Sequence, residues 1–485
     1  MFAVNEKQLF GVLSLAVGIY FLSISIPTNY TSDTGDGIQH YMLARFAYLY
    51  PHLFLDLWGK PVFNVLASPF AQFGIQGIHF FNLVCSLLCC RVCFSIAAVL
   101  GLRFGWLLVL LICFSPIYFL EIPSGLTEPL FCLTMVLSVY LLLKKDYVFA
   151  AALVSFLPYT RQEGYLMLPI FGLFLVLNKH VRAMPFLLLA TVLLSVVGSF
   201  YHKDLFWLFH QNPYKDASNV YGHGELLHFV NNTKLTFGLA QAPFLLIGLL
   251  FLGFKLIKNK FKWLYGKAKN EAQEQLQIEV LVVAGYVVVF FVCHSVWWWQ
   301  GWFASLGLLR VMACVVPLVA LLVLRGLNVL LDLMPQRLKF LEWVLALMLA
   351  FLVVITPFKQ YYYPLVLGGE EQTIAKASDY IKNNQILYSK VYFSHPFFVL
   401  LNDIDPFDTQ KSDYCWSIDK ENPEKTVKKG EIVVYDTHYA PNDMGLKLEL
   451  LTQNPNFELL QKFVPQEPFV VLGGYNYEVY IFRKK

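Results

Sequence analysis

Charged side chains of two kinds occur at spacings that suit acid–base and phosphate chemistry. Asp33 and Asp36 lie three residues apart in a stretch rich in Ser, Thr and Gly. Lone bases follow at Lys60, Arg161 and Arg310. A carboxylate accepts the proton of an attacking hydroxyl, and cations stabilise negative charge that grows on a leaving group. The residue types therefore suit a group-transfer reaction, provided that the fold brings them to one place.

Simpler interpretations compete with this one. Asp33 and Asp36 have the composition of a solvated turn, and Lys60 and Arg310 have the positions of interfacial residues whose stems cover apolar surface. Arg161 has a carboxylate two residues away, and Glu128 stands before Pro129, where a helix dipole favours an acid. The remaining polar candidates are His40, Glu128 and Glu163, and Glu163 is the carboxylate two residues from Arg161.

The composition decides what kind of protein positions these residues. Of 485 residues, 57% are hydrophobic, 16% aromatic and only 14% charged. Soluble domains carry about a quarter charged residues, so the composition excludes an ordinary cytosolic enzyme, a disordered chain and a nucleic-acid-binding protein. Eight of the nine cysteines lie in apolar runs, which argues against a disulfide framework. We expect a multi-pass integral membrane protein.

About eleven segments are long and apolar enough to be read as membrane helices. A helical bundle of this size predicts an all-α membrane domain over residues 1–356, with outer loops at 27–77 and 201–236. The expected spans are 8–26, 78–100, 104–120, 126–143, 147–158, 164–178, 183–200, 237–254, 278–294, 306–324 and 340–356.

The basic residues predict the orientation. One set of connections, which includes 255–269 and 325–339, is rich in Lys and Arg, and these short loops are expected in the cytoplasm. The opposite set is longer and poorer in bases. This places the N-terminus inside and the C-terminal residues outside, and it puts all the candidate residues on the extracytoplasmic face. We expect a bacterial inner membrane with a periplasmic C-terminal domain. An endoplasmic-reticulum membrane with a lumenal domain is the alternative, since Asn29-Tyr30-Thr31 and Asn231-Asn232-Thr233 match the glycosylation sequon.

Residues 357–485 differ from the rest of the chain. Their apolar runs shorten to strand length at 391–394, 432–435, 470–473 and 478–482, while 373–383 and 446–451 have helical spacing. We therefore predict a small extracytoplasmic α/β domain after the membrane domain.

An extracytoplasmic reaction needs an energy source that the membrane delivers. The predicted cytoplasmic loops are too short for a nucleotide-binding domain, and neither a P-loop nor a dinucleotide motif is present. A sugar linked to polyprenyl phosphate is one such activated donor. Attack on its anomeric carbon needs a carboxylate base and cations near the departing phosphate.

Several short motifs resemble the GT-C glycosyltransferases, which include protein O-mannosyltransferases and lipid A aminoarabinose transferases. The stretch 32–41 after the first span is similar to the acidic motif of their first outer loop, and Lys60-Pro61 resembles their downstream Lys-Pro. Similar short segments occur at 125–129, 161–164 and 307–310. The resemblance covers residues 1–356 and scarcely extends into the C-terminal domain.

The resemblance implies roles for individual residues. Asp36 becomes the catalytic base. Gly37 stands where many relatives have Glu, so either Asp33 supplies the second carboxylate or the protein manages with one. The expected residues at the substrate are Lys60, Arg161 and Arg310 for the donor phosphate, together with His40, Glu128 and Glu163. It further implies an inverting hexosyl or pentosyl transfer to a lipid, glycan or protein hydroxyl. No cofactor is firmly predicted beyond the lipid-linked donor. Whether a divalent ion helps to hold the phosphate of the donor stays open. The four histidines in 201–236 lack the spacing of a zinc motif.

Two other classes remain open at this stage. A transporter or lipid flippase uses charges along a path, although such proteins tend to have repeated halves and broken helices at mid-membrane, and we find no repeat. A non-catalytic assembly protein would present the C-terminal domain to partners. Membrane lipid is a partner in every case, and nucleic acid is not.

Overall fold

The computed structural model describes residues 5–213, 222–303, 305–360 and 367–485. Parts of two predicted regions, 214–221 of the predicted outer loop 201–236 and 361–366 of the predicted C-terminal domain 357–485, lie outside the described residues. The chain divides into two compact units. The helical unit comprises residues 1–29 and 51–363, and the mixed unit comprises residues 30–50 and 364–485.

Six helical segments of the described chain are long and apolar enough to cross a membrane. They are α1 (Glu6–Ser25), α4 (Ile75–Val99), α10 with its preceding turn (Val181–His202), α15 to α16 (Glu271–Gln300), α17 with its preceding turn (Leu309–Leu333) and α18 (Leu341–Gln360). Four shorter apolar helical segments accompany them: α3 (Pro61–Ala71), α7 (Glu128–Leu143), α8 (Tyr147–Tyr159 with its 3₁₀ turn) and α9 (Gln162–Leu177 with its 3₁₀ turn). The chain is an integral multi-pass membrane protein. The mostly helical fold is confirmed, whereas the number of eleven spans stays a prediction.

Some expected spans are interrupted for identifiable reasons. The segment predicted over 104–120 is divided into α5 (Leu107–Cys113) and α6 (Pro116–Glu121), because Pro116 has no N–H for the preceding turn. The predicted loop 27–77 contains α2 (Asp36–Phe46) as well as α3. Residues Glu279–Ala284 form a π-helical turn within the long α15–α16 segment.

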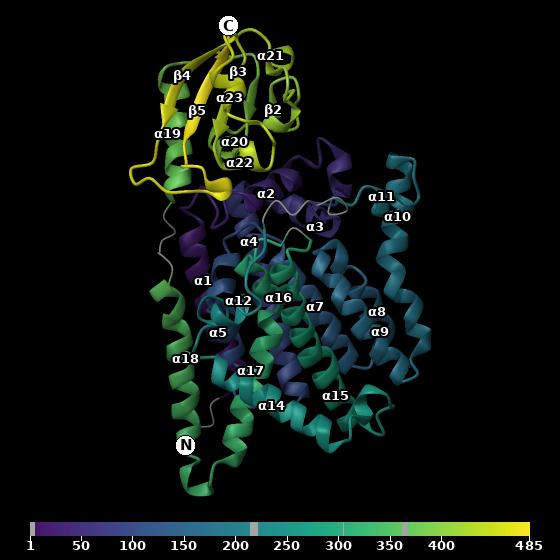
Figure 1. The fold of residues 1–485 in the computed structure, drawn as a ribbon. Coiled ribbons are helices and arrows are strands. Elements are labelled where there is room, and N and C mark those ends of the chain that lie inside the picture. Colours follow the sequence, from purple (N-terminus) through teal and green to yellow (C-terminus); the bar gives the residue numbers. More distant parts are fainter. Residues whose placement is uncertain (1–4, 214–221, 304, 361–366) are drawn as a thin grey trace. The chain divides into compact units, whose positions relative to one another are not determined.

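The core of the helical unit lies around α4, α7 and α17. Helix α4 packs on α1, α3, α5 and α7, and α17 packs on α5, α7 and α14 (Ala242–Lys258), as Figure 1 shows. The side chains of α17 that face these neighbours are fully buried, whereas α10 exposes an almost continuous apolar surface. Such a surface is expected where a helix faces lipid.

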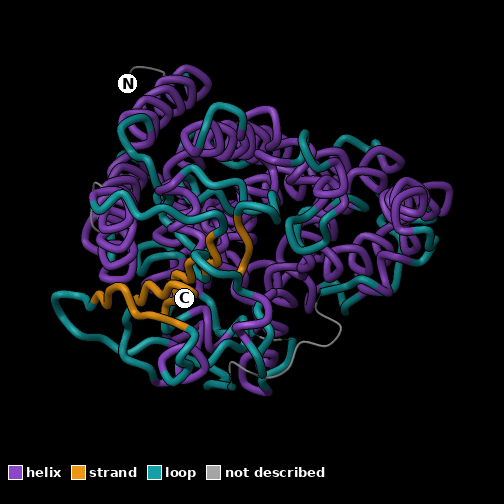
Figure 2. The backbone as a smooth tube through the Cα atoms, turned by 90° about the horizontal axis from the view of Figure 1, so that it is seen from above, coloured by secondary structure: helices purple, strands orange, loops and turns teal. Residues whose placement is uncertain are grey.

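The mixed unit contains a five-stranded sheet in the order β2-β1-β3-β5-β4, and Figure 2 shows its strands in orange. The strands are β1 (Val391–Phe393), β2 (Ser412–Tyr414), β3 (Ile432–Asp436), β4 (Phe457–Phe463) and β5 (Val479–Lys484). β1 pairs in parallel with β2 and β3, while β5 runs antiparallel to β3 and β4.

The predicted α/β character of the C-terminal domain is confirmed, with two local differences. Residues 470–473 form a 3₁₀ turn and a single bridge in place of the expected strand, because Gly473 and Gly474 adopt left-handed backbone. β4 was not expected. It is an edge strand in which Glu458, Gln461 and Lys462 are exposed and interrupt the apolar residues, so it lacks the continuous apolar run of a buried strand.

The mixed unit also includes the acidic motif that follows the first membrane helix. Residues 30–50, which the sequence assigns to the membrane part, pack with residues 364–485. Arg45 of α2 forms a 2.8 Å ion pair with Asp403, and Tyr50 donates a 3.0 Å hydrogen bond to Asp405. The C-terminal residues therefore provide the packing surface on which this motif folds.

Candidate functional site

Arg161 is the centre of a buried charge cluster in the helical unit. Its guanidinium lies 2.7 Å from Glu128 Oε1 and 2.8 Å from Glu163 Oε1. The exposed fractions of the three side chains are 15% for Arg161, 0% for Glu128 and 3% for Glu163. Burial of an ion is costly unless opposite charges compensate it, so the three groups depend on one another.

The two carboxylates contact the guanidinium differently. Glu163 accepts hydrogen bonds from both Nε and Nη2 of Arg161, at 3.2 and 2.8 Å, which is the bidentate arrangement that a planar fork favours. Glu128 forms an ion pair without hydrogen-bond geometry, and neither of its oxygens accepts a hydrogen bond from the described residues. The Nη1 group of Arg161 donates a 3.2 Å hydrogen bond to Thr127 Oγ1 and not to Glu128. Glu128 therefore retains unused acceptor capacity inside the helical unit.

Local backbone structure explains how Arg161 reaches this position. It lies between two 3₁₀ turns, Leu157–Tyr159 and Gln162–Leu166. At Gly164 an added Cβ would lie 2.4 Å from the carbonyl carbon of Leu157, so only glycine permits the two turns to pack. Glu128 comes from the first turn of α7, where the helix dipole favours a carboxylate.

Lys60 and Arg310 belong to the same charge cluster. The ammonium of Lys60 interacts electrostatically with Arg161 and Glu163, and Arg310, at the turn that leads into α17, interacts with Glu128. Lys60 is 8% exposed and precedes Pro61 with a left-handed backbone of φ 67°, which is uncommon for a residue with a side chain. Burial lowers the pKa of Lys60 from its ordinary value to about 8.

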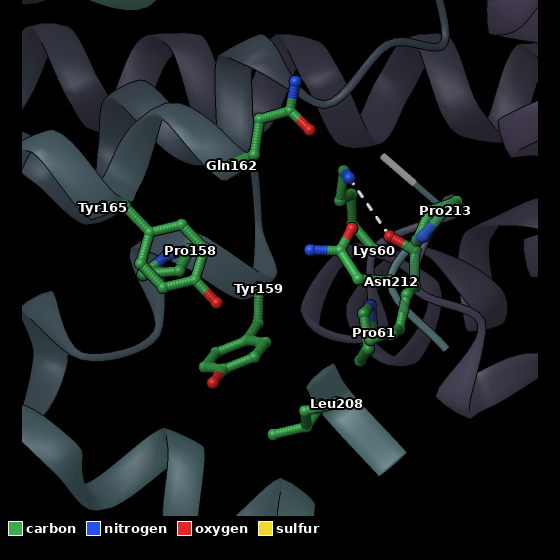
Figure 3. Close-up of a pocket in the computed structure, with 10 residues that line it drawn as sticks. Lys60, Pro61, Pro158, Tyr159, Gln162, Tyr165, Leu208, Asn212 and Pro213 are labelled. Carbon is green, nitrogen blue, oxygen red and sulfur yellow. Dashed lines mark hydrogen bonds between the residues drawn. The ribbon is translucent and has the colours of Figure 1, made fainter. Parts of the chain in front are cut away.

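A pocket opens beside Lys60, and Figure 3 shows its lining. Tyr159, Gln162 and Tyr165 come from the turns on either side of Arg161, and Asn212 comes from the loop after α11 (Trp207–His210). Lys60 Nζ donates a 3.1 Å hydrogen bond to the carbonyl of Leu57, one of its three donors. The pocket combines a cation, amides and phenol rings, which suits an anion attached to an organic group.

The other predicted site residues lie in the mixed unit. Asp36 is the first residue of α2, and His40 follows one turn later on the same face, buried at 6% exposure. Asp33 accepts a 3.0 Å hydrogen bond from the backbone N–H of Gly37, which satisfies one of the free donors at the start of α2. The structure thus groups Lys60, Glu128, Arg161, Glu163 and Arg310 in one cluster and Asp33, Asp36 and His40 in one motif.

Several residues near these groups were not predicted from the sequence. Tyr286 of α16 donates a 3.3 Å hydrogen bond to the backbone carbonyl of Glu163, and His294 interacts electrostatically with the Glu163 carboxylate. An ionisable residue inside a predicted span is a signal of function, and that signal was available for His294. Among the described residues, no group of three or more His, Cys, Asp and Glu side chains is arranged to hold a metal ion.

Comparisons with known proteins support the architecture. No protein-family model matches the sequence, and no curated protein matches it by sequence. Its structure is similar to that of ArnT from Cupriavidus metallidurans in the apo state, with a TM-score of 0.55 and 12% sequence identity over 98% of both chains. At this identity the likeness concerns the fold alone, and it confirms an ArnT-like architecture over the whole chain: a helical membrane part followed by a small C-terminal α/β domain.

Proposed function

We propose that the chain is a membrane glycosyltransferase of the GT-C type. It transfers a sugar from a polyprenyl-phosphate donor to a lipid, glycan or protein hydroxyl on the extracytoplasmic side. The observation that carries this proposal is the buried cluster around Arg161, with Lys60 at its pocket, in a chain that shares the ArnT fold. ArnT is an aminoarabinose transferase, and a lipid-linked donor is consistent with its fold.

The cations of the cluster suit a phosphate ligand. Lys60, Arg161 and Arg310 provide three positive charges, and Glu128, Glu163 and Asp56, which interacts with Lys60, provide three negative ones. Arg161 is held between its two carboxylates. Lys60 is the cation that lines the pocket, where it could contact a phosphate.

The proposed reaction is a single displacement. The acceptor hydroxyl oxygen attacks the anomeric carbon, and Asp36 accepts the hydroxyl proton as the new carbon–oxygen bond forms. The bond between the anomeric carbon and the phosphate oxygen breaks, and polyprenyl phosphate leaves with the electron pair. Lys60 and Arg310 stabilise the charge on the leaving phosphate, and the anomeric configuration inverts.

The test is release of polyprenyl phosphate by the purified full-length protein. A panel of polyprenyl-phosphate sugars is incubated with the protein in lipid nanodiscs together with extracted membrane acceptors, and product configuration is determined by NMR. Asp36→Asn is expected to abolish release, because the amide cannot accept the proton. Asp379→Asn, on the exposed side of helix α19 (Gly369–Asn383), is the control. Transfer that survives in Asp36→Asn would remove the assigned base.

A further inference from the structure

The acidic loop, which we define as residues 31–37, is held by the C-terminal part of the mixed unit. Thr34 donates a hydrogen bond to Glu371, in the first turn of helix α19. Gln39, one turn into α2, accepts a hydrogen bond from the hydroxyl of Tyr414. Thus side chains more than 330 positions away in the sequence hold the loop on both sides of Asp36.

Tyr439 of the C-terminal part also lies against the acidic loop, beside Gly35. A Cβ added to Gly35 would lie 2.3 Å from the Tyr439 hydroxyl oxygen, while the next atoms, Tyr439 Cζ and Asp33 Oδ1, would lie at 3.5 and 3.8 Å. The backbone of Gly35 has φ −91° and ψ −94°, which is not left-handed but lies outside the common helical and extended regions, so a side chain here also carries some backbone strain. The hydroxyl of Tyr439 is the one neighbouring side-chain atom that a methyl group at this position would overlap.

Strand topology explains why Tyr439 is held firmly. His395 and His438 follow the carboxyl ends of β1 and β3, which are parallel neighbours, so the two segments meet at one edge of the sheet. The Tyr439 ring stacks on His438 with centroids 4.6 Å apart and contacts the edge of His395 at 5.0 Å. Both the Tyr439 and His438 amides donate to Asp436 Oδ1, at 2.8 and 2.9 Å.

Glu370 connects this support to helix α19. Its carboxylate lies 3.1 Å from His438 Nδ1 and 3.6 Å from His395 Nε2, while the next residue, Glu371, bonds to the acidic loop. Burial beside Asp33 and Asp36 raises the pKa of Tyr439 well above its ordinary value, so the phenol stays neutral next to the two acids. The ring cannot move without disturbing the histidines and the strand ends.

We propose that Tyr439 is a positioning residue for Asp36: its phenol, fixed by His395 and His438, sets the backbone of the acidic loop at Gly35 and thereby the direction of the Asp36 carboxylate. The inference rests on the proposed function for the role of Asp36. It assigns the C-terminal domain a part in the reaction, because that domain determines where the base points.

The experiment is a double-mutant cycle on the full-length protein. Gly35→Ala places a methyl group against the Tyr439 hydroxyl and is expected to lower kcat by about 10-fold to 100-fold, because small misplacements of a reacting group are costly. KM for the lipid donor should remain unchanged. Tyr439→Phe alone removes a loop contact and is expected to lower kcat modestly. In Gly35→Ala with Tyr439→Phe the nearest contact becomes an ordinary 3.5 Å, so kcat should recover to within about threefold of Tyr439→Phe alone.

A control and a second measurement separate the possible results. Gly253→Ala in α14 adds a methyl group that meets no heavy atom of the described residues within 4 Å beyond its chain neighbours and its own helical turns, and it controls for helix and handling effects. Wild-type kcat in Gly35→Ala, or no recovery in the double variant, overturns the positioning role. If the wild type transfers no sugar, the proposed function fails instead. The same cycle measured by thermal unfolding then decides the inference: coupling supports the contact, and additivity refutes it.

Discussion

Removal of the Arg161 charge tests the buried cluster most directly. In Arg161→Met two carboxylates, with 0% and 3% of their side chains exposed, lose the cation that lies 2.7 and 2.8 Å away. Breaking a buried ion pair at one partner costs about 3–5 kcal/mol, because the remaining charge is left uncompensated. Because Lys60 and Arg310 also face these carboxylates and remain in the variant, we expect a loss of up to this size in the free energy of unfolding.

Two companion variants identify the cause of that loss. The triple variant Arg161→Met, Glu128→Gln, Glu163→Gln removes both stranded carboxylates and should recover part of the loss. The recovery is incomplete because Lys60 and Arg310 then lose the carboxylates that they face. Arg45→Met breaks an ion pair with Asp403 that is largely exposed. Exposed pairs contribute about 0–1 kcal/mol, so this control should change stability only slightly.

The assay is denaturant titration of the purified protein in detergent micelles, with the free energy extrapolated linearly. A loss of less than about 1 kcal/mol in Arg161→Met would refute the view that the cluster is electrostatically interdependent. A triple variant that is no more stable than the single one would show that the loss comes from packing of the arginine stem and not from the stranded carboxylates.

Three further predictions concern glycine packing and pH. Gly164→Ala should lower the free energy of unfolding by about 1–3 kcal/mol or more, because the added Cβ would overlap the backbone of the preceding turn. In the same denaturant titration, Gly253→Ala should be neutral or slightly stabilising. Donor binding should weaken as pH rises through about 8, because Lys60 loses its proton there, whereas Lys60→Arg should keep donor binding constant to higher pH. The measurement is KM for the donor from pH 7 to 9.5, and a wild-type KM that does not change over this range would contradict the prediction. Burial lowers the pKa of His438, but the carboxylate of Glu370 raises it above the ordinary histidine value. The interaction therefore stabilises the fold fully below the ordinary histidine pKa, and this stabilisation is lost as pH rises through the raised value. The difference in unfolding free energy between the wild type and Glu370→Gln should decrease over that pH range, and a difference that increases would refute the pairing.

Much of the architecture was predictable because it depends on composition and short-range pattern. Apolar runs of membrane length and a charged fraction of 14% determine a multi-pass helical protein whatever its tertiary details. The change to short apolar runs after residue 357 is enough to indicate an α/β domain. The acidic motif and Lys60-Pro61 were recognisable because their residues are adjacent in the chain.

The relations between distant residues needed the tertiary structure. Arg161 and Glu163 are two residues apart and suggest a pair by themselves, but Glu128 and Arg310 join them only because α7 and the turn before α17 pack around Arg161. Helix breaks were also missed, since a span interrupted at Pro116 has the same hydropathy as an intact one.

The packing of the acidic motif was decided in the same way. Residues 30–50 follow the first span in sequence, and nothing local indicates that they fold on residues 364–485. Tyr439 meets Gly35 because two parallel strands end side by side and direct their following loops to one edge of the sheet. Sequence pattern determined which elements form and which residue types carry charge, whereas long-range strand and helix pairing decided which of those residues meet.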